Sequence, residues 1–214
     1  MFQQTSYDHK KLIGWVLDER NPGATPGATY DYSNFGYCVL GRIIEKKSGQ
    51  SYVGYVKNSI LKKCGISDMH IGGNTKSQKR SNEVVYYGGS AYDYNIKRMD
   101  AHGGWIASAV DLARFAVHVD GFNTEPDILN SSTINTMTTG SSANSGYAKG
   151  WAVNGSNNWW HNGKISGNGA ILVRTSSGYC WAFLMNKTWE GEADGMMWDV
   201  VNGINSIPSS INLF

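Results

Sequence analysis

The stretch TPGATYDYSNFGYCVLGRIIEKKSGQSY, residues 25–52, carries the most regular pattern in this sequence. Apolar residues recur along it with the spacing of one helix face, at Phe35, Val39, Leu40, Ile43 and Ile44. Gly49 follows at the point where such a helix would end. The pattern therefore predicts a helix over residues 34–48.

Three consecutive polar residues, Tyr32, Ser33 and Asn34, stand at the start of this predicted helix. Polar side chains at such a junction either cap the helix or present chemistry to a cleft. Which of the two holds depends on the residues that the fold brings to the same place from further along the chain.

Other segments extend the helical pattern on both sides of this stretch. Ser108, followed three residues later by Asp111, resembles a capping box, and Gly121 stands where the helix between them would stop. The loop DERNPGATPGAT and the irregular region 70–100 separate helical segments. Further helices are predicted over residues 6–18, 51–62, 131–139 and 191–205.

The periodicity changes in the last third of the chain. GYAKGWAVN, NWWHNG, GNGAILVRT and GYCWAFLMN are short, rich in aromatic and aliphatic residues, and separated by glycine or asparagine. Such segments are typical of antiparallel strands, and SSG between Thr175 and Tyr179 predicts a hairpin turn. The predicted fold class is α+β within a single domain, residues 1–214. A mainly helical lobe, 1–140, lies beside antiparallel strands and a C-terminal helix, 141–214.

Composition limits the classes of partner. The 214 residues carry a formal net charge of +2, with 17% charged side chains and scattered basic residues. A nucleic-acid surface needs a denser basic stripe, and a membrane span needs about 20 apolar residues in a row. The sequence predicts neither nucleic-acid binding nor a membrane span. The N-terminal MFQQTSYDHKK lacks the apolar core of a signal peptide, and the compartment stays open.

No metal or cofactor site is predicted. The cysteines, at positions 38, 64 and 180, are odd in number and lack CxxC spacing, which argues against a disulfide framework and against zinc. His70, His102 and His118 have no ligand-like spacing.

A candidate site combines the junction at Tyr32 with the segment HNGK that begins at His161. A phenol acts as a base only where nearby positive charge lowers its pKa from about 10, and the amide of Asn34 can hold a carbonyl or amide group. Gly163 lets a strand edge approach a ligand closely, so that the backbone N–H of Lys164 could stabilise an oxyanion. Trp159 or Trp160, next to His161, is the tryptophan expected to touch a ligand, and Trp160 is the one assigned to the site. Aromatic residues in strands nevertheless more often build a core.

Taken together and in this order, these segments resemble serine hydrolases of the penicillin-binding-protein and class C β-lactamase superfamily. The group includes D-alanyl-D-alanine carboxypeptidases and β-lactamase-like esterases. The similarity covers most of residues 22–187 and includes PGATYDYSNFGYCVLGRIIEKKSGQSY, HGGWIASAVDLARF, GYAKGWAV and WWHNGKISGNGAILVRT. The resemblance implies a β-lactamase/transpeptidase-like fold whose N-terminal part is missing from this chain. It also implies a small-molecule or peptide substrate and no cofactor.

The resemblance also implies roles for the site residues. Tyr32 and Asn34 match the Tyr-x-Asn motif, whose tyrosine shuttles protons and whose asparagine contacts substrate. His161, Asn162 and Gly163 match the position of the Lys-Thr-Gly motif in its His-x-Gly form. In this scheme His161 supplies polar or positive character near Tyr32, and Asn162 faces the substrate.

The family's nucleophile has no match before Tyr32. That nucleophile is the serine of Ser-x-x-Lys, and in this sequence the motif occurs once, from Ser59 to Lys62, after Tyr32 and near the end of a predicted helix. We therefore expect the nucleophile to lie on a segment missing from this chain.

Three functions remain open. The chain is part of an acyl hydrolase that opens an ester, amide or β-lactam through an acyl-enzyme, or a non-catalytic module that binds a peptide or acyl ligand. In the third alternative it is one half of a split enzyme, completed by a partner chain.

Overall fold

The helix predicted after Ser33 is present in the computed structural model as α2 (Asn34–Ser48). Ser33 is its N-cap, and the Ser33 Oγ accepts a hydrogen bond from the N–H of Gly36 over 3.0 Å. Gly49 follows the last turn in the left-handed conformation, with φ at 70°, which a glycine adopts without steric cost. The sequence-based prediction of both helix ends is confirmed.

The structure describes residues 1–20, 23, 25–87, 91–165, 167–187, 195, 199–200 and 202–203. The predicted C-terminal helix over 191–205 lies mostly outside these residues. Within the described ranges, no helix combines the length and the apolar character that crossing a membrane requires.

The other helices follow the predicted segments closely. The helix predicted over 51–62 begins as an α-helix, Tyr52–Val56, and ends in a π-helical turn, Lys57–Leu61. Short 3-10 turns occupy Lys76–Gln78 and Ile96–Met99. The α-helices besides α2 are α1 (His9–Glu19), α3 (Tyr52–Val56), α4 (Ala109–Val117) and α5 (Ser131–Thr138).

Helix α4 begins as predicted but ends early. The Ser108 Oγ accepts from the N–H of Asp111 (3.0 Å) and donates to the Asp111 Oδ2 (2.8 Å). The predicted stop at Gly121 is wrong, because the chain leaves the α-helix after Val117. The N–H of His118 donates to the carbonyl of Phe115 three residues back, which tightens the last turn.

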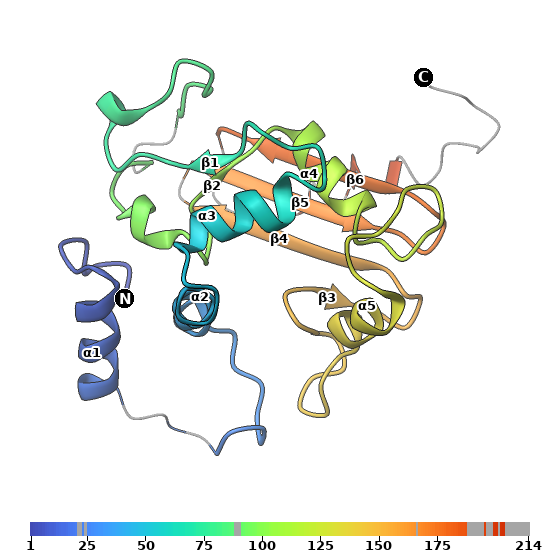
Figure 1. Ribbon diagram of the computed structural model, residues 1–214, viewed down its shortest axis with the longest axis horizontal. Coiled ribbons are helices and arrows are strands. Elements are labelled where there is room, and N and C mark those ends of the chain that lie inside the picture. The colour runs from blue at the N-terminus through green and yellow to red at the C-terminus, as the bar shows by residue number, and fades with distance from the viewer. Residues whose placement is uncertain are drawn as a thin grey trace.

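The predicted strands form one antiparallel sheet, in the order β3 (Ala152–Val153), β4 (Trp159–Ile165), β5 (Asn168–Arg174) and β6 (Cys180–Met185) (Figure 1). The predicted turn between β5 and β6 is confirmed, since the N–H of Thr175 donates to the carbonyl of Tyr179 over 2.8 Å. A second, two-stranded sheet pairs β1 (His70–Ile71) with β2 (Trp105–Ile106). The sequence analysis did not foresee it, because strands of two residues carry no periodicity. The α+β class is confirmed.

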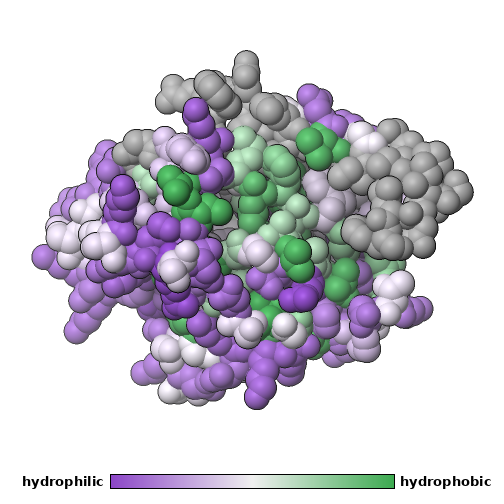
Figure 2. All heavy atoms as spheres, turned by 90° about the horizontal axis from the view of Figure 1, so that it is seen from above, coloured by the Kyte–Doolittle hydropathy of each residue, from purple (hydrophilic) through white to green (hydrophobic). Residues whose placement is uncertain are grey.

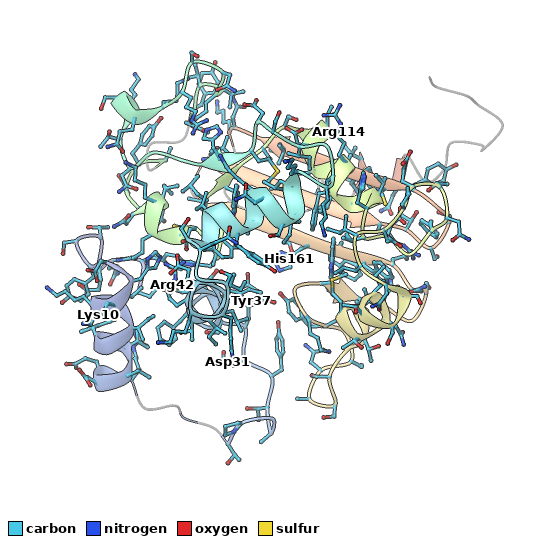
Figure 3. All side chains as sticks on the ribbon, viewed as in Figure 1. Lys10, Asp31, Tyr37, Arg42, Arg114 and His161 are labelled. Carbon is cyan, nitrogen blue, oxygen red and sulfur yellow. The ribbon has the colours of Figure 1, made fainter. Side chains whose placement is uncertain are left out.

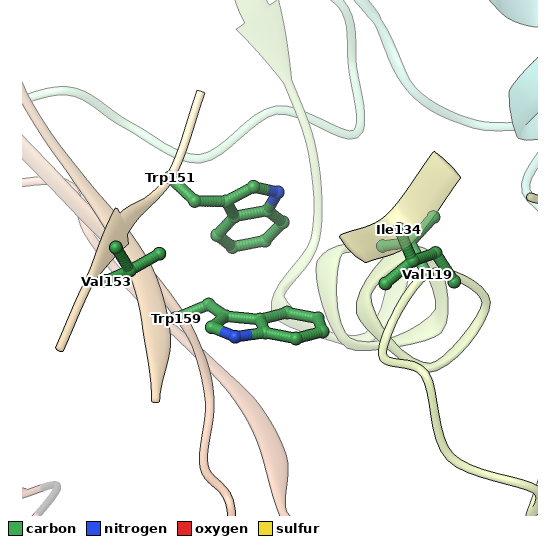
Figure 4. Close-up of a cluster of buried hydrophobic side chains, with 5 residues drawn as sticks. All are labelled: Val119, Ile134, Trp151, Val153 and Trp159. Atoms are coloured by element: carbon green, nitrogen blue, oxygen red, sulfur yellow. The ribbon is translucent and has the colours of Figure 1, made fainter. Parts of the chain in front are cut away.

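The sheet and the helices bury their apolar faces against each other. Helix α4 packs against β5 and β6. In the cluster of Figure 4, the indoles of Trp151 and Trp159 come from the sheet side and meet Val119 and Ile134 from the helical side. This cluster fixes β3 and β4 relative to α4 and α5.

One edge of the sheet is left open where the cluster ends. Strand β3 pairs with β4 only at Trp159 and Trp160. From His161 to Ile165, the opposite neighbour β5 is the only strand partner of β4 among the described residues. Backbone groups along this edge are therefore available to a ligand.

Candidate active site

A cavity of about 1020 Å³ lies between α2 and the open edge of β4. Tyr32 and Asn34 line it from the start of α2, and residues 161–165 line it from β4. Figure 3 labels Tyr37 on α2 and His161 on β4, which line the same cavity from these two elements. Seen from above, the molecule has a hollow around which hydrophobic atoms gather (Figure 2).

The three polar residues at the start of α2 have two different roles. Ser33 caps the helix, whereas Tyr32 and Asn34 line the cavity. The side chain of Tyr32 is 52% exposed, and its ring centroid lies 6.3 Å from that of His161. The residues that the sequence analysis combined, 129 positions apart, therefore meet at one site.

Hydrogen bonds fix the protonation state of His161. Its Nδ1 lies 2.7 Å from the carbonyl oxygen of Asn162, and its Nε2 lies 2.8 Å from the hydroxyl of Tyr147. Burial lowers the pKa of His161, and the bond to the Asn162 carbonyl offsets only part of that effect. At neutral pH the ring thus places a polar group beside Tyr32 but no positive charge.

Tyr147 is a residue of this site that the sequence analysis did not single out. It pairs with Ala152 across a tight turn, and Ala152 pairs with Trp160, the neighbour of His161. Burial and the nearby phenols, Tyr37 first among them, raise the pKa of the Tyr147 hydroxyl. Its sequence signal is its place in GYAKGWAV, a segment predicted as a strand and included in the family resemblance, with no role assigned to the tyrosine.

The open edge of β4 presents Asn162, Gly163 and Lys164 to the cavity, and all three residues are exposed. A Cβ built on Gly163 would meet no atom within 4 Å, so the space beside this glycine is open. Trp160 is placed differently, since it packs against Ile171 and Val173 in a hydrophobic cluster and is not among the residues that line the cavity.

The far wall of the cavity is aromatic and contains a buried histidine. Tyr86, Tyr92 and Tyr94 line this wall, as a rim loop would. His102 is 9% exposed, and neither of its ring nitrogens has a hydrogen-bond partner. Burial lowers the pKa of His102 to about 4.

The literal Ser-x-x-Lys match lies away from this site. Ser59 belongs to the π-helical turn, and Leu61 beside it is buried in a cluster with Cys64 and Ile66. Neither Ser59 nor Lys62 is among the residues that line the cavity. The described side chains also include no group of three or more His, Cys, Asp or Glu residues arranged to hold a metal ion.

Known proteins resemble this chain in sequence. A family model described as Beta-lactamase matches residues 3–204. A penicillin-binding protein of Bacillus subtilis (strain 168) is 28% identical over 114 residues, which is 53% of this chain and 24% of that protein. A putative D-alanyl-D-alanine carboxypeptidase of Escherichia coli (strain K12) is 24% identical over 162 residues, which is 61% of this chain and 36% of that protein.

Solved structures share the fold. The D-amino acid amidase of Ochrobactrum anthropi SV3 superposes with a TM-score of 0.74 at 18% identity, covering 97% of this chain and 67% of the amidase. The chain spans well under half the length of the two curated relatives, 24% and 36%. By the match over residues 3–204, the chain belongs to the β-lactamase family of serine hydrolases, to which penicillin-binding proteins and D-alanyl-D-alanine carboxypeptidases are related.

Proposed function

We propose that the cavity between α2 and β4 is the acyl-transfer site of a serine hydrolase, and that the serine comes from a segment outside this chain. One observation carries the proposal: Tyr32, just before α2, and Asn34, its first residue, converge with the open edge of β4 on a single cavity of about 1020 Å³. The substrate class is an ester, an amide or a peptide.

Each residue has a role in this scheme. Tyr32 exchanges protons, Asn34 and Asn162 hold polar groups of the substrate, and the backbone N–H of Lys164 stabilises the oxyanion. The donated serine oxygen bonds to the acyl carbon. Its proton passes through Tyr32 to the leaving amine or alcohol, and water then releases the acid. Because His161 is neutral, the positive charge that activates Tyr32 comes from the lysine of the donated Ser-x-x-Lys.

The size of the cavity supports a donated segment. Small-molecule sites usually occupy about 300–1000 Å³, so a cavity of about 1020 Å³ has room for a substrate and for a short stretch of chain. The amidase with the same fold acts, by its name, on D-amino acid amides, and the amide class is therefore the first to test.

The experiment compares the purified chain alone with the chain plus a fragment that carries Ser-x-x-Lys. The probes are a fluorescent penicillin, nitrocefin and p-nitrophenyl butyrate. We expect no covalent label on the chain alone, and labelling of the fragment at its serine in the mixture. A fragment with that serine replaced by alanine is the control.

Two results would overturn parts of the proposal. Covalent label on the chain alone, mapped to one of its own serines, would refute the donated nucleophile. Tyr32→Phe should reduce the restored turnover by roughly 100-fold or more, the usual size of a general acid–base contribution. Unchanged turnover in that variant would remove Tyr32 from the mechanism.

A second candidate is a binding module without turnover. The position of Ser59 outside the cavity lining favours it, because the chain's own Ser-x-x-Lys does not reach the site. Saturable binding of an acyl-peptide by the chain, with no product from any mixture, would establish this alternative.

A further inference from the structure

Tyr147 contacts three aromatic side chains at the mouth of the site. Its ring centroid lies 5.4 Å from that of Tyr30, 6.1 Å from that of Tyr32 and 5.9 Å from that of His161. The contacts with Tyr32 and His161 are edge-to-face, an arrangement that aromatic rings favour. Tyr147 therefore joins the loop before α2 to strand β4.

The direction of its hydrogen bond follows from the partners of His161. The Asn162 carbonyl can only accept, so the proton of the ring sits on Nδ1. The Nε2 of the neutral ring is then unprotonated and can only accept a hydrogen bond, so the Tyr147 hydroxyl 2.8 Å away donates to it. In this state, Nε2 has no proton to offer to a substrate.

Tyr147 is itself held in place by the backbone around it. The turn that follows closes with a bond from the N–H of Ala148 to the carbonyl of Trp151, over 2.7 Å. Gly150 adopts φ of 90° in this turn, and a Cβ there would lie 3.4 Å from the Tyr37 hydroxyl. The hairpin thus holds the backbone that carries Tyr147 without the help of a ligand.

We propose that Tyr147 is a positioning residue, which holds His161 as the neutral Nδ1–H tautomer and holds the ring of Tyr32 against it. The consequence for catalysis rests on the proposed function: with Nε2 of His161 occupied, Tyr32, which is 52% exposed, is the group that exchanges a proton with the substrate. The hydrogen bond and the tautomer do not depend on turnover, and they can be measured in the chain as it is.

The test is a ¹⁵N titration of the histidine rings by NMR, on the full 214-residue chain from pH 5 to 8. The wild-type chain is compared with Tyr147→Phe, which keeps the ring and removes the hydroxyl. Tyr179→Phe, at the β5–β6 turn, is the matched control, and His161→Gln identifies the signal. We expect His161 to be the neutral Nδ1–H tautomer in the wild-type chain and in the control.

In Tyr147→Phe the neutral ring loses a donated hydrogen bond, so protonation becomes easier. The titration midpoint of His161 should rise by about 0.7 pH unit, and the ring should become a mixture of tautomers. A wild-type ring protonated on Nε2 would overturn the proposal without any variant. An unchanged midpoint and tautomer in Tyr147→Phe would overturn it as well.

Turnover provides a second measurement in the mixture with the donated fragment. Tyr147→Phe should lower kcat by about 10-fold with little change in KM, since the substrate contacts remain, and the acid limb of the pH profile should move with the His161 midpoint. Equal loss at every pH contradicts a role through His161. If no mixture turns over substrate, the proposed function fails, and the NMR result still decides the role of Tyr147.

Discussion

Asp100 shows how a single carboxylate holds two distant segments together. It accepts a hydrogen bond from the Arg42 Nη2 of α2 over 2.6 Å, and its Oδ1 lies 3.3 Å from the Nε2 of His9 in α1. Burial acts to raise the pKa of Asp100, but the bonds from His9 and Arg42 outweigh it and hold the pKa below its ordinary value. The ion pair is largely shielded from solvent, because the side chains of Arg42 and Asp100 are 18% and 8% exposed.

Replacing Asp100 with asparagine should therefore be costly. Asp100→Asn removes the more buried of the two carboxylates that pair with Arg42 and leaves Glu45, which lies 3.2 Å from the Arg42 Nε and is 33% exposed. We expect the free energy of unfolding to fall by about 3 kcal/mol. Urea denaturation measures the loss. The control is Arg114→Gln, since Arg114 is 54% exposed and lies 3.5 Å from Asp111. That pair should contribute under about 1 kcal/mol, and equal losses in the two variants would contradict the account.

At the scale of single residues, the sequence predicts the residues that lie in motifs but not the contacts that depend on strand pairing. Tyr32, Asn34 and His161 lie in recognisable motifs, and the structure brings them to one cavity. Tyr147 was missed because its contact with His161 depends on the register of β3 and β4, which no local pattern encodes. Whether His161 is polar or positive stays open in the sequence, because the burial that lowers its pKa is not encoded by a local pattern.

Helix α2 comes very close to the segment that follows Ile96–Met99. Gly41 is buried in the middle of the helix, and a Cβ built there would lie 2.6 Å from the Cβ of Ala101. Contacts this short do not occur between real side chains, so an added methyl group must push the two segments apart. The absence of a side chain at Gly41 is therefore a packing requirement, although glycine lowers helix propensity.

Two glycine-to-alanine variants test this requirement at the level of helices. Gly41→Ala should lower the free energy of unfolding by about 1–3 kcal/mol through overpacking. Gly14→Ala in α1 is the matched control, because a Cβ there meets nothing within 4 Å, and it should raise the free energy by up to about 1 kcal/mol. The midpoints of urea denaturation compare the two. A Gly41→Ala chain as stable as the wild type would show that α2 does not pack as described.

At the scale of elements, periodic segments were predicted well and short ones were not. Helices α2 and α5 and strands β4 to β6 match their predicted segments, since each is at least six residues long. The pairing of β1 with β2 was not foreseen, because it joins residues 36 and 34 positions apart, His70 with Ile106 and Ile71 with Trp105. The predicted stop at Gly121 was wrong, since α4 ends at Val117 and the N–H of His118 bonds to the carbonyl three residues back instead of four.

The stability of the whole molecule should depend on pH through His102. Its pKa falls from 6.5 to about 4 in the folded chain because the ring is buried. Between these values the unfolded chain binds a proton that the folded chain does not, so stability falls as pH falls. The shift corresponds to a loss of roughly 3 kcal/mol between pH 6.5 and 4.

At still lower pH, the stability of the folded chain depends on carboxylates instead of His102. The folded pKa values of Asp100 and Glu83 lie below their ordinary values, 3.8 and 4.5. Stability from these carboxylates is present above the ordinary values and is lost as pH falls through the lower folded ones. His102→Phe should reduce the pH dependence of the free energy of unfolding only between pH 6.5 and 4. Denaturation at a series of pH values measures this dependence. An unchanged slope in this variant would exclude His102 as its source.

The account as a whole depends on α2 and β4 placing two rings at one cavity. Nuclear Overhauser effects between the ring protons of Tyr32 and His161 measure this directly, since the centroids lie 6.3 Å apart. Phe2 and Tyr94, with centroids 6.0 Å apart, serve as the internal standard. We expect cross-peaks from His161 to both Tyr32 and Tyr147. Cross-peaks for Phe2 and Tyr94 with none between Tyr32 and His161 would contradict the shared site.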